Sequence, residues 1–167
     1  VTGVQTCALP ICSAAASVGR DPSEVTLVGI TKTVPEARIR IAVEAGLRDL
    51  GENYVQELRA KQPLLPTATW HFVGTLQGGS ARHVARHADV VQTLAPGGAV
   101  ERLSSRLAVL GRSIPCLIEV DLTGDRPGVR PEDLRSFAAR VRSLPGVRLV
   151  GLMTLPPAGA DPEAARP

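Results

Sequence analysis

The sequence predicts an α/β fold in which the strands of a parallel sheet alternate with helices. From Asp21 onward, short apolar runs alternate with stretches of helical character, which is typical of repeated strand–helix units. The first run, residues 25–32, is largely apolar on both of its alternating faces, as expected of a parallel strand covered on both sides. Hydrophobic residues make up 44% of the chain and charged residues 21%, so we expect a single globular unit.

Six strands and five helices are expected in strict alternation. The predicted strands are residues 25–32, 48–52, 70–75, 89–94, 114–122 and 147–155, and the predicted helices are residues 35–46, 53–62, 79–87, 97–111 and 131–143.

Several of these boundaries have a chemical reason. Pro35 and Pro131 each suit the first turn of a helix, where a missing N–H costs nothing. Gly46 and Gly111 suit the left-handed position that follows a helix. The hydroxyl of Ser80 can cap the third helix.

The strand–helix pattern leaves two parallel architectures open. Six units with short connections fit an open doubly wound sheet or a closed (β/α)8 TIM-type barrel. No Gly-x-Gly-x-x-Gly follows the first strand, which removes the strongest sign of a dinucleotide-binding fold. A barrel needs about 200 to 250 residues, so a barrel here would be incomplete, with about six units of eight.

The first dozen residues are set apart from the fold. Residues 1–11 read Val-Thr-Gly-Val-Gln-Thr-Cys-Ala-Leu-Pro-Ile, which looks like the conceptual translation of a sequencing-library adapter. A signal peptide is the rival interpretation, but this segment lacks an initiating Met, a basic n-region and a continuous apolar region. We therefore expect residues 1–12 to be an artefact and residues 13–167 to form a partial barrel domain.

The composition argues against several classes of protein. The isoelectric point near 9.1 suggests nucleic acid, but aromatic residues are only 2% and the arginines are spread along the chain, so we expect no nucleic-acid partner. No apolar run approaches the roughly 20 residues of a membrane span, so we expect no membrane contact and a cytoplasmic location. Cys116 lies in an apolar strand and is predicted to be an inert thiol. The spacing of the histidines predicts no metal site.

Lys32 is the residue that most suggests chemistry. It is one of two lysines, with Lys61, and it lies where strand 25–32 meets the helix start at Pro35. Burial lowers the pKa of a lysine, and the neutral amine can attack a carbonyl carbon to form an imine. The alternative is a lysine at a strand end whose ammonium group simply reaches solvent. Residue chemistry alone leaves both open.

Four segments in order carry a resemblance to a known family: Gly29-Ile-Thr-Lys-Thr33, Gly51-Glu-Asn-Tyr-Val-Gln-Glu57, Trp70-His-Phe-Val-Gly-Thr-Leu-Gln77 and Gly151-Leu-Met-Thr154. They resemble the YggS/PROSC family of pyridoxal phosphate homeostasis proteins, and the likeness extends from about residue 13 to residue 167. The resemblance implies a single-domain barrel like the N-terminal domain of alanine racemase, with the cofactor pyridoxal 5′-phosphate held as a lysine aldimine.

The resemblance also implies the cofactor-binding residues. Lys32 matches the imine-forming lysine, Asn53 and His71 match positions lining the barrel mouth, and Met153 matches a methionine of the sixth strand near the cofactor. Each of the last three has a plainer alternative, since Asn53 can cap a helix, His71 can be a hydrogen-bonded core histidine and Met153 can fill the core. No catalytic residue is predicted, because Tyr54, the only tyrosine, is a poor second acid or base.

The function implied by the resemblance is reversible binding of pyridoxal phosphate without substrate turnover. We expect a bacterial protein, monomeric, that takes part in intracellular homeostasis of the cofactor and makes transient contact with pyridoxal-phosphate-dependent apoenzymes. One alternative is an amino-acid racemase-type enzyme of the same barrel class. Another is a non-functional, truncated translation product.

The sequence departs from the family pattern in two places besides its start. It ends at Pro167, before the strands that in the family bring the serine and glycine groups holding the cofactor phosphate. Leu76-Gln-Gly-Gly-Ser80 stands where the family usually has an Asn-Lys pair. A barrel without its last units would expose unpaired strand edges, so we expect poor solubility of the expressed chain.

Overall fold

The computed structural model describes residues 3–155, with side chains from residue 9 onward, as six parallel strands and the helices that connect them. The strands are β1 (Val28–Ile30), β2 (Asp49–Glu52), β3 (Thr69–Phe72), β4 (Val90–Leu94), β5 (Ile114–Glu119) and β6 (Val147–Met153). The helices are α1 (Gly3–Ser17), α2 (Glu36–Glu44), α3 (Val55–Lys61), α4 (Ala81–His87), α5 (Ala99–Val109) and α6 (Leu134–Arg142), with 3-10 turns η1 (Pro22–Glu24), η2 (Gln62–Leu64) and η3 (Pro131–Asp133).

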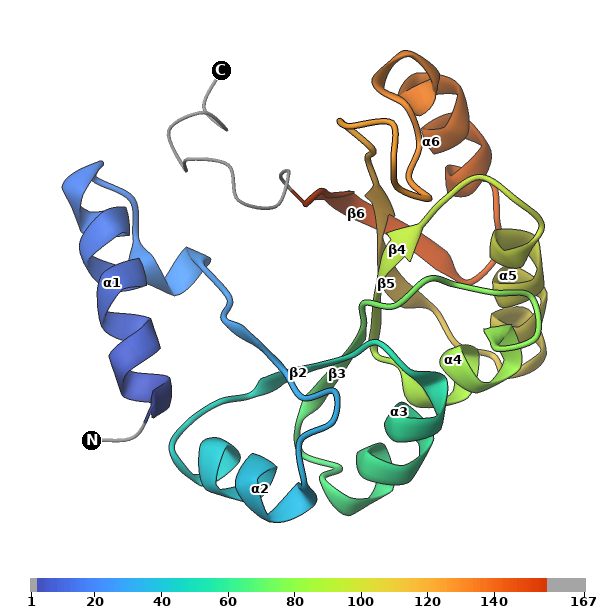
Figure 1. Cartoon of the computed structure of the whole chain (residues 1–167). Coiled ribbons are helices and arrows are strands. Elements are labelled where there is room, and N and C mark those ends of the chain that lie inside the picture. The colour runs from blue at the N-terminus through green and yellow to red at the C-terminus, as the bar shows by residue number, and fades with distance from the viewer. Residues whose placement is uncertain (1–2, 156–167) are drawn as a thin grey trace.

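The strands lie in the sheet in their order along the chain, and every neighbouring pair is parallel. Figure 1 shows the sheet curving while α2 to α6 follow one another along its outer side. A doubly wound sheet would reverse its strand order part-way, whereas a barrel adds strands in one direction only. The strand order therefore answers the question that the sequence left open, in favour of a barrel that is partial over the described residues.

The hydrophobic core lies between the sheet and these helices. Leu50, Trp70 and Phe72 from neighbouring strands are buried on the side of the sheet that faces the helices. The Trp70 indole N–H donates a 3.1 Å hydrogen bond to the carbonyl of Leu65, so this large side chain leaves no polar atom unpaired. Burial of one such side chain stabilises the fold by about 2–3 kcal/mol.

The inner face of the sheet is less covered than the sequence suggested. A Cβ atom added at Gly51 would lie 2.6 Å from Cδ1 of Ile30 and 3.3 Å from Cγ1 of Val28, so these residues share the inner face. Ile30 is 47% exposed. The expectation that both faces of the first strand are covered is thus wrong for this face, because β1 is an edge strand of an open sheet in the part of the chain described.

All the predicted strands and helices are present, and the differences lie at their ends. The first strand keeps ladder pairing only over Val28–Ile30, and the helix predicted at 131–143 begins with the 3-10 turn η3. Gly46 and Gly111 have φ values of +103° and +62°, which confirms their place after helix ends. Pro35 precedes the first helical residue of α2 instead of occupying it.

Ser80 occupies the N-cap position of α4, but its hydroxyl does not cap the helix. Ser80 Oγ donates to the carbonyl of Gln77 at 2.9 Å and accepts from the Gln77 amide at 3.3 Å. The side chain therefore closes the preceding turn.

Helix α1 includes part of the segment 1–12, which we expected from the sequence to be a sequencing-adapter artefact. That assignment stays a prediction. Within residues 3–155 we find no helix of the length and apolar character that a membrane crossing requires.

Candidate functional site at the carboxyl ends of the strands

Lys32 and Asn53 follow the carboxyl ends of adjacent strands. Ile30 pairs with Gly51 in the ladder, and the Thr31 amide extends it with a 2.9 Å hydrogen bond to the Gly51 carbonyl. Lys32 and Asn53 each come two residues after that pair, so they lie at the same level of the sheet edge. In α/β proteins this edge is where ligands bind.

The Lys32 side chain is exposed. The desolvated surroundings expected from the sequence are therefore not found among the described residues, in keeping with the open inner face beside β1. No hydrogen bond or ion pair to the Lys32 ammonium occurs within residues 3–155.

The residues on either side of Lys32 are held firmly. Thr31 is buried, and its hydroxyl donates a 2.7 Å hydrogen bond to Oε1 of Glu52. Thr33 has a φ of +61°, an unusual conformation for a β-branched residue, and its amide donates a 2.8 Å hydrogen bond to Oε2 of Glu57. The left-handed conformation costs roughly 1–2 kcal/mol, so the turn needs contacts of this kind.

Lys61 joins both carboxylates. Its ammonium donates to Glu52 Oε1 at 2.7 Å, to Glu57 Oε2 at 2.5 Å and to the Thr31 carbonyl at 2.7 Å. The side chains of Lys61, Glu52 and Glu57 are 11%, 0% and 27% exposed. Burial alone would lower the pKa of Lys61, but the hydrogen bonds to Glu52 and Glu57 raise that pKa above its ordinary value. The hydrogen bond from Lys61 lowers the pKa of Glu57.

His71 lies within β3 and is buried between two polar partners. Its Nε2 is 3.0 Å from Oδ1 of Asp49 in β2, and its Nδ1 is 2.8 Å from Nε2 of Gln92 in β4. The side-chain nitrogen Nε2 of Gln92 is a donor only and the Asp49 carboxylate is an acceptor only, so Nδ1 of His71 accepts and Nε2–H donates to Asp49, a tautomer assigned from these contacts. His71 is thus hydrogen-bonded through both ring nitrogens, as the alternative interpretation held, but it lies on the inner face of the sheet and not in the core between the sheet and the helices. It pairs in the ladder with Gly51, two residues before Asn53.

Asn53 does not cap helix α3, since that position belongs to Tyr54. The capping alternative is therefore wrong for Asn53. Asn53 and Tyr54 instead line a cavity of about 410 Å³ at the ends of β2 and β3, together with Gln56, Thr75, Gln77 and Ser80 among others. Tyr54 is exposed and makes no capping hydrogen bond.

Met153 stands apart from the other predicted residues. It ends β6, pairs with Glu119 in the ladder and lines an apolar cavity of about 350 Å³ with Leu134 and Leu152. Four strands separate β6 from β1 in the sheet. The structure therefore places Lys32, Asn53 and His71 on or just after three adjacent strands, β1 to β3, and leaves Met153 on the last strand of the sheet, β6.

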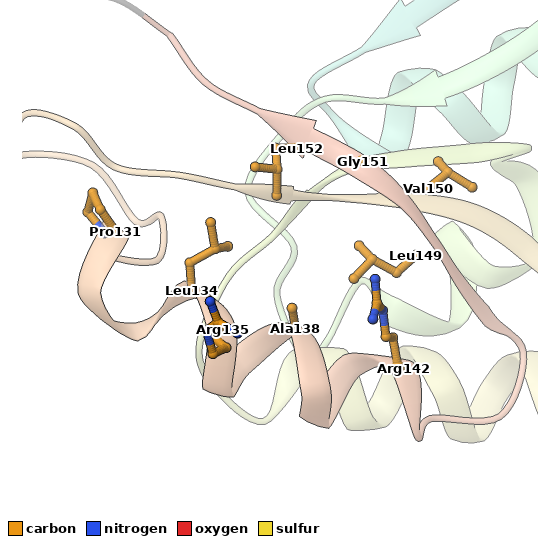
Figure 2. Close-up of a pocket in the computed structure, with 9 residues that line it drawn as sticks. All are labelled: Pro131, Leu134, Arg135, Ala138, Arg142, Leu149, Val150, Gly151 and Leu152. Atoms are coloured by element: carbon orange, nitrogen blue, oxygen red, sulfur yellow. The ribbon is translucent and has the colours of Figure 1, made fainter.

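Another cavity, of about 520 Å³, contains none of the predicted site residues. Figure 2 shows it between α6, which contributes Leu134 and Ala138, and β6, which contributes Leu149 and Leu152. This face of β6 points toward the helix layer, away from the inner face that carries Gly51 and His71.

Two other buried titratable groups take no part in this site. Burial raises the pKa of Cys116 to about 12, and its thiol donates to the Ile114 carbonyl, in agreement with the buried thiol expected from the sequence. Burial also raises the pKa of Glu119. Among the described residues no group of three or more His, Cys, Asp or Glu side chains is arranged to hold a metal ion.

The sequence interpretation missed the residues that support the site. Glu52, Glu57 and Lys61 fix the turn at Lys32, and Asp49 and Gln92 fix His71. One signal was available for the first group: Lys61 is the second of two lysines and lies four residues after Glu57, a spacing that brings two side chains together on a helix.

The family model described as alanine racemase, N-terminal domain, matches residues 33–166. The chain belongs to this family. The resemblance found in its motifs is thereby confirmed, and so is the TIM-type barrel, as a partial barrel of six strands over the described residues.

Family relatives include two pyridoxal phosphate homeostasis proteins. The protein of Pseudomonas aeruginosa is 38% identical over 155 residues, which cover 90% of this chain and 67% of the relative. The protein of Escherichia coli K12 is 37% identical over 153 residues, which cover 87% of this chain and 65% of the relative. The chain spans about two thirds of the length of these curated relatives.

Solved structures of the family agree with the fold. PipY of Synechococcus elongatus PCC7942, solved with PLP bound, is 37% identical and superposes with a TM-score of 0.77 over 90% of this chain and 72% of its own. Alanine racemase from Streptomyces coelicolor A3(2) is 21% identical, with a TM-score of 0.71 over 97% of this chain and 44% of its own. The racemase shares the fold of this family domain.

Proposed function

We propose that this chain binds pyridoxal phosphate covalently through Lys32 and takes part in keeping the level of that cofactor in the cell. One observation carries the proposal: the ammonium of Lys61 is fully engaged, whereas Lys32 is exposed at the sheet edge. The names of the curated relatives and the PLP bound to PipY support the choice of cofactor.

The residues present fit the aldehyde end of this cofactor. When bound, pyridoxal phosphate supplies an aldehyde, with which an amine can condense to form a C=N bond and release water, and a negatively charged phosphate. Lys32 presents the amine at the sheet edge, and Asn53 presents a side-chain amide on the adjacent strand at the same level. We assign no phosphate ligand among residues 3–155.

We further propose that the chain does not turn over a substrate. Racemisation needs a second acid or base on the face of the cofactor opposite the lysine. Tyr54 is the only tyrosine in the chain, and it lies at the start of α3, half exposed and beside Asn53. The monomeric state, the cytoplasmic location and the transient contacts with apoenzymes stay predictions.

The test is to trap the bond that Lys32 makes. The chain is incubated with pyridoxal phosphate, freed of unbound cofactor, reduced with borohydride and mapped by peptide mass spectrometry, and the absorbance spectrum is followed throughout. We expect one adduct, on Lys32, that disappears in Lys32→Arg. Arginine keeps the positive charge but cannot form the covalent bond, so this variant separates chemistry from charge. An adduct elsewhere, or none, would contradict the proposal.

The racemase alternative is tested on the same sample. We expect no interconversion of L- and D-alanine by the loaded chain, measured by chiral chromatography. Interconversion that is lost in Lys32→Arg would instead favour an enzyme of the racemase type.

A further inference from the structure

We propose that Lys61, held by Glu52 and Glu57, fixes the turn that carries Lys32 and is itself withheld from amine chemistry, so that an aldehyde is directed to Lys32. Lys61 is in this sense a positioning residue. The inference deepens the proposed function and rests on it for the identity of the aldehyde, while its geometric part concerns this chain alone.

The Lys61 ammonium uses all of its hydrogen-bond donors. An ammonium group has three N–H bonds, and Lys61 has three acceptors at 2.5–2.7 Å, of which two are carboxylate oxygens. To attack a carbonyl carbon, the amine must lose a proton and give up at least one of these acceptors, because its lone pair must face the carbon. Lys32 has no such partners within residues 3–155. Reaction at Lys61 therefore costs hydrogen bonds to carboxylates, whereas reaction at Lys32 does not.

The turn at Lys32 is held on both sides by the same two carboxylates. The two carboxylates that bind Lys61 also bind the residues on either side of Lys32, since Glu52 accepts from the Thr31 hydroxyl and Glu57 accepts from the Thr33 amide. Lys61 adds a third link through the Thr31 carbonyl. A cation placed between the carboxylates therefore holds both ends of a three-residue segment whose middle residue is the proposed cofactor lysine.

The cluster of Lys61, Glu52 and Glu57 is a poor source of net stability. Buried ion pairs are weak sources of stability, because desolvation offsets much of the attraction. Oε2 of Glu52 is buried and has no hydrogen-bond partner among the described residues, which makes the arrangement costlier still. The cluster thus contributes local order more than net stability, and the place that it orders is the turn at Lys32.

The first experiment measures amine selectivity without any cofactor. The folded chain is acetylated with limiting acetic anhydride, and the fractions modified at Lys32 and Lys61 are read by peptide mapping. We expect Lys32 to react at least about tenfold faster, in line with the strength of hydrogen bonds to charged groups. In Glu57→Gln, which keeps the side-chain size at the outer edge of the cluster, we expect the Lys61 rate to rise several-fold. Equal rates in the unmodified chain, or an unchanged ratio in the variant, would overturn the proposal.

The second experiment measures the turn. Hydrogen exchange of the Thr33 amide is followed by NMR in the unmodified chain, Lys61→Met and Lys61→Arg. We expect exchange to rise about tenfold in Lys61→Met and to recover in part in Lys61→Arg, which restores a cation. Glu36→Gln is the matched control, because Glu36 pairs with Arg40 at the same four-residue spacing in α2 and should leave Thr33 unaffected. If exchange of the Thr33 amide changes only in proportion to the global stability of each variant, the cluster is an ordinary structural ion pair and the positioning role is wrong.

The third experiment separates this proposal from the proposed function. The borohydride trapping is repeated with Glu57→Gln, and we expect part of the adduct to move to Lys61. If the unmodified chain forms no adduct while the acetylation ratio behaves as expected, the proposed function fails and the positioning role stands. If the variant forms its adduct on Lys32 alone, at the unmodified rate, the positioning role fails and the proposed function stands.

Discussion

Gly74 packs directly against the backbone of Asn53. A Cβ atom added at Gly74 would lie 1.9 Å from the carbonyl oxygen of Asn53, and the Gly74 carbonyl accepts a 2.6 Å hydrogen bond from the Thr93 hydroxyl. The absence of a side chain at Gly74 therefore allows the chain after β3 to lie directly against the chain after β2 at Asn53.

Gly74→Ala should destabilise the chain by about 2–4 kcal/mol, because the new methyl group meets backbone that can move only with its strand. Gly79→Ala serves as control, since an added Cβ there meets nothing within 4 Å. Urea denaturation followed by circular dichroism measures both. Equal stability of the two variants would mean that the strand ends adjust freely.

Gln92→Ala should cost about 1 kcal/mol, because it removes the donor to Nδ1 of buried His71 and leaves that nitrogen unpaired. The same denaturation experiment measures the change. Gln56→Ala, at an exposed position of α3, should change the stability by less than about 0.5 kcal/mol. In NMR spectra the His71 ring should keep its Nε2–H tautomer in Gln92→Ala, because the Asp49 carboxylate still accepts from Nε2–H.

The pH dependence of stability should reflect Glu57. Its pKa is lowered in the folded chain by the hydrogen bond from Lys61, so the carboxylate stabilises the fold above the ordinary glutamate pKa, near 4.5. That contribution is lost as the pH falls below about 4.5 toward the folded-state pKa. We expect unfolding midpoints between pH 7 and pH 3 to fall less steeply in Glu57→Gln than in the unmodified chain. Parallel pH profiles for the two proteins would argue against the lowered pKa.

Cys116 should resist alkylation while the chain is folded. With its pKa raised to about 12, only about one thiol in ten thousand is ionised at pH 8, and the side chain is fully buried. Cys12 is exposed and serves as an internal control. Iodoacetamide at pH 8 should therefore label Cys12 first, and Cys116 only after addition of denaturant, as peptide mapping would reveal. Labelling of both at one rate would indicate that the sheet opens readily.

The elements of the fold were predictable because each one is a local pattern. Apolar runs such as residues 114–119 and glycines such as Gly46 and Gly111 carry their structural meaning within a few residues. The ends of elements were less predictable, since the ladder pairing of β1 depends on β2, 21 residues later. The choice between barrel and open sheet needed the order of the strands, which no local pattern encodes.

The site was predictable only in part, for a related reason. Lys32 draws notice as a lysine beside an apolar strand, but the contacts that fix its turn come from residues 21 to 30 positions away. The partners of His71 come from strands on both sides of it. Interactions of this kind depend on how the strands align. The local sequence around a histidine in a strand therefore does not reveal whether a carboxylate lies beside it on the neighbouring strand.

The scarcity of lysine gives this chain an unusual analytical property. It has 2 lysines and 17 arginines among its 19 basic residues, and one of the lysines is tied up in the Glu52–Glu57 cluster. Apart from the α-amino group at the start of the chain, a single side-chain amine is then open to aldehydes. Once any adduct on the α-amino group is subtracted, the intact mass of the reduced protein would therefore report the occupancy of Lys32, without the background of surface lysines that obscures such titrations in most proteins.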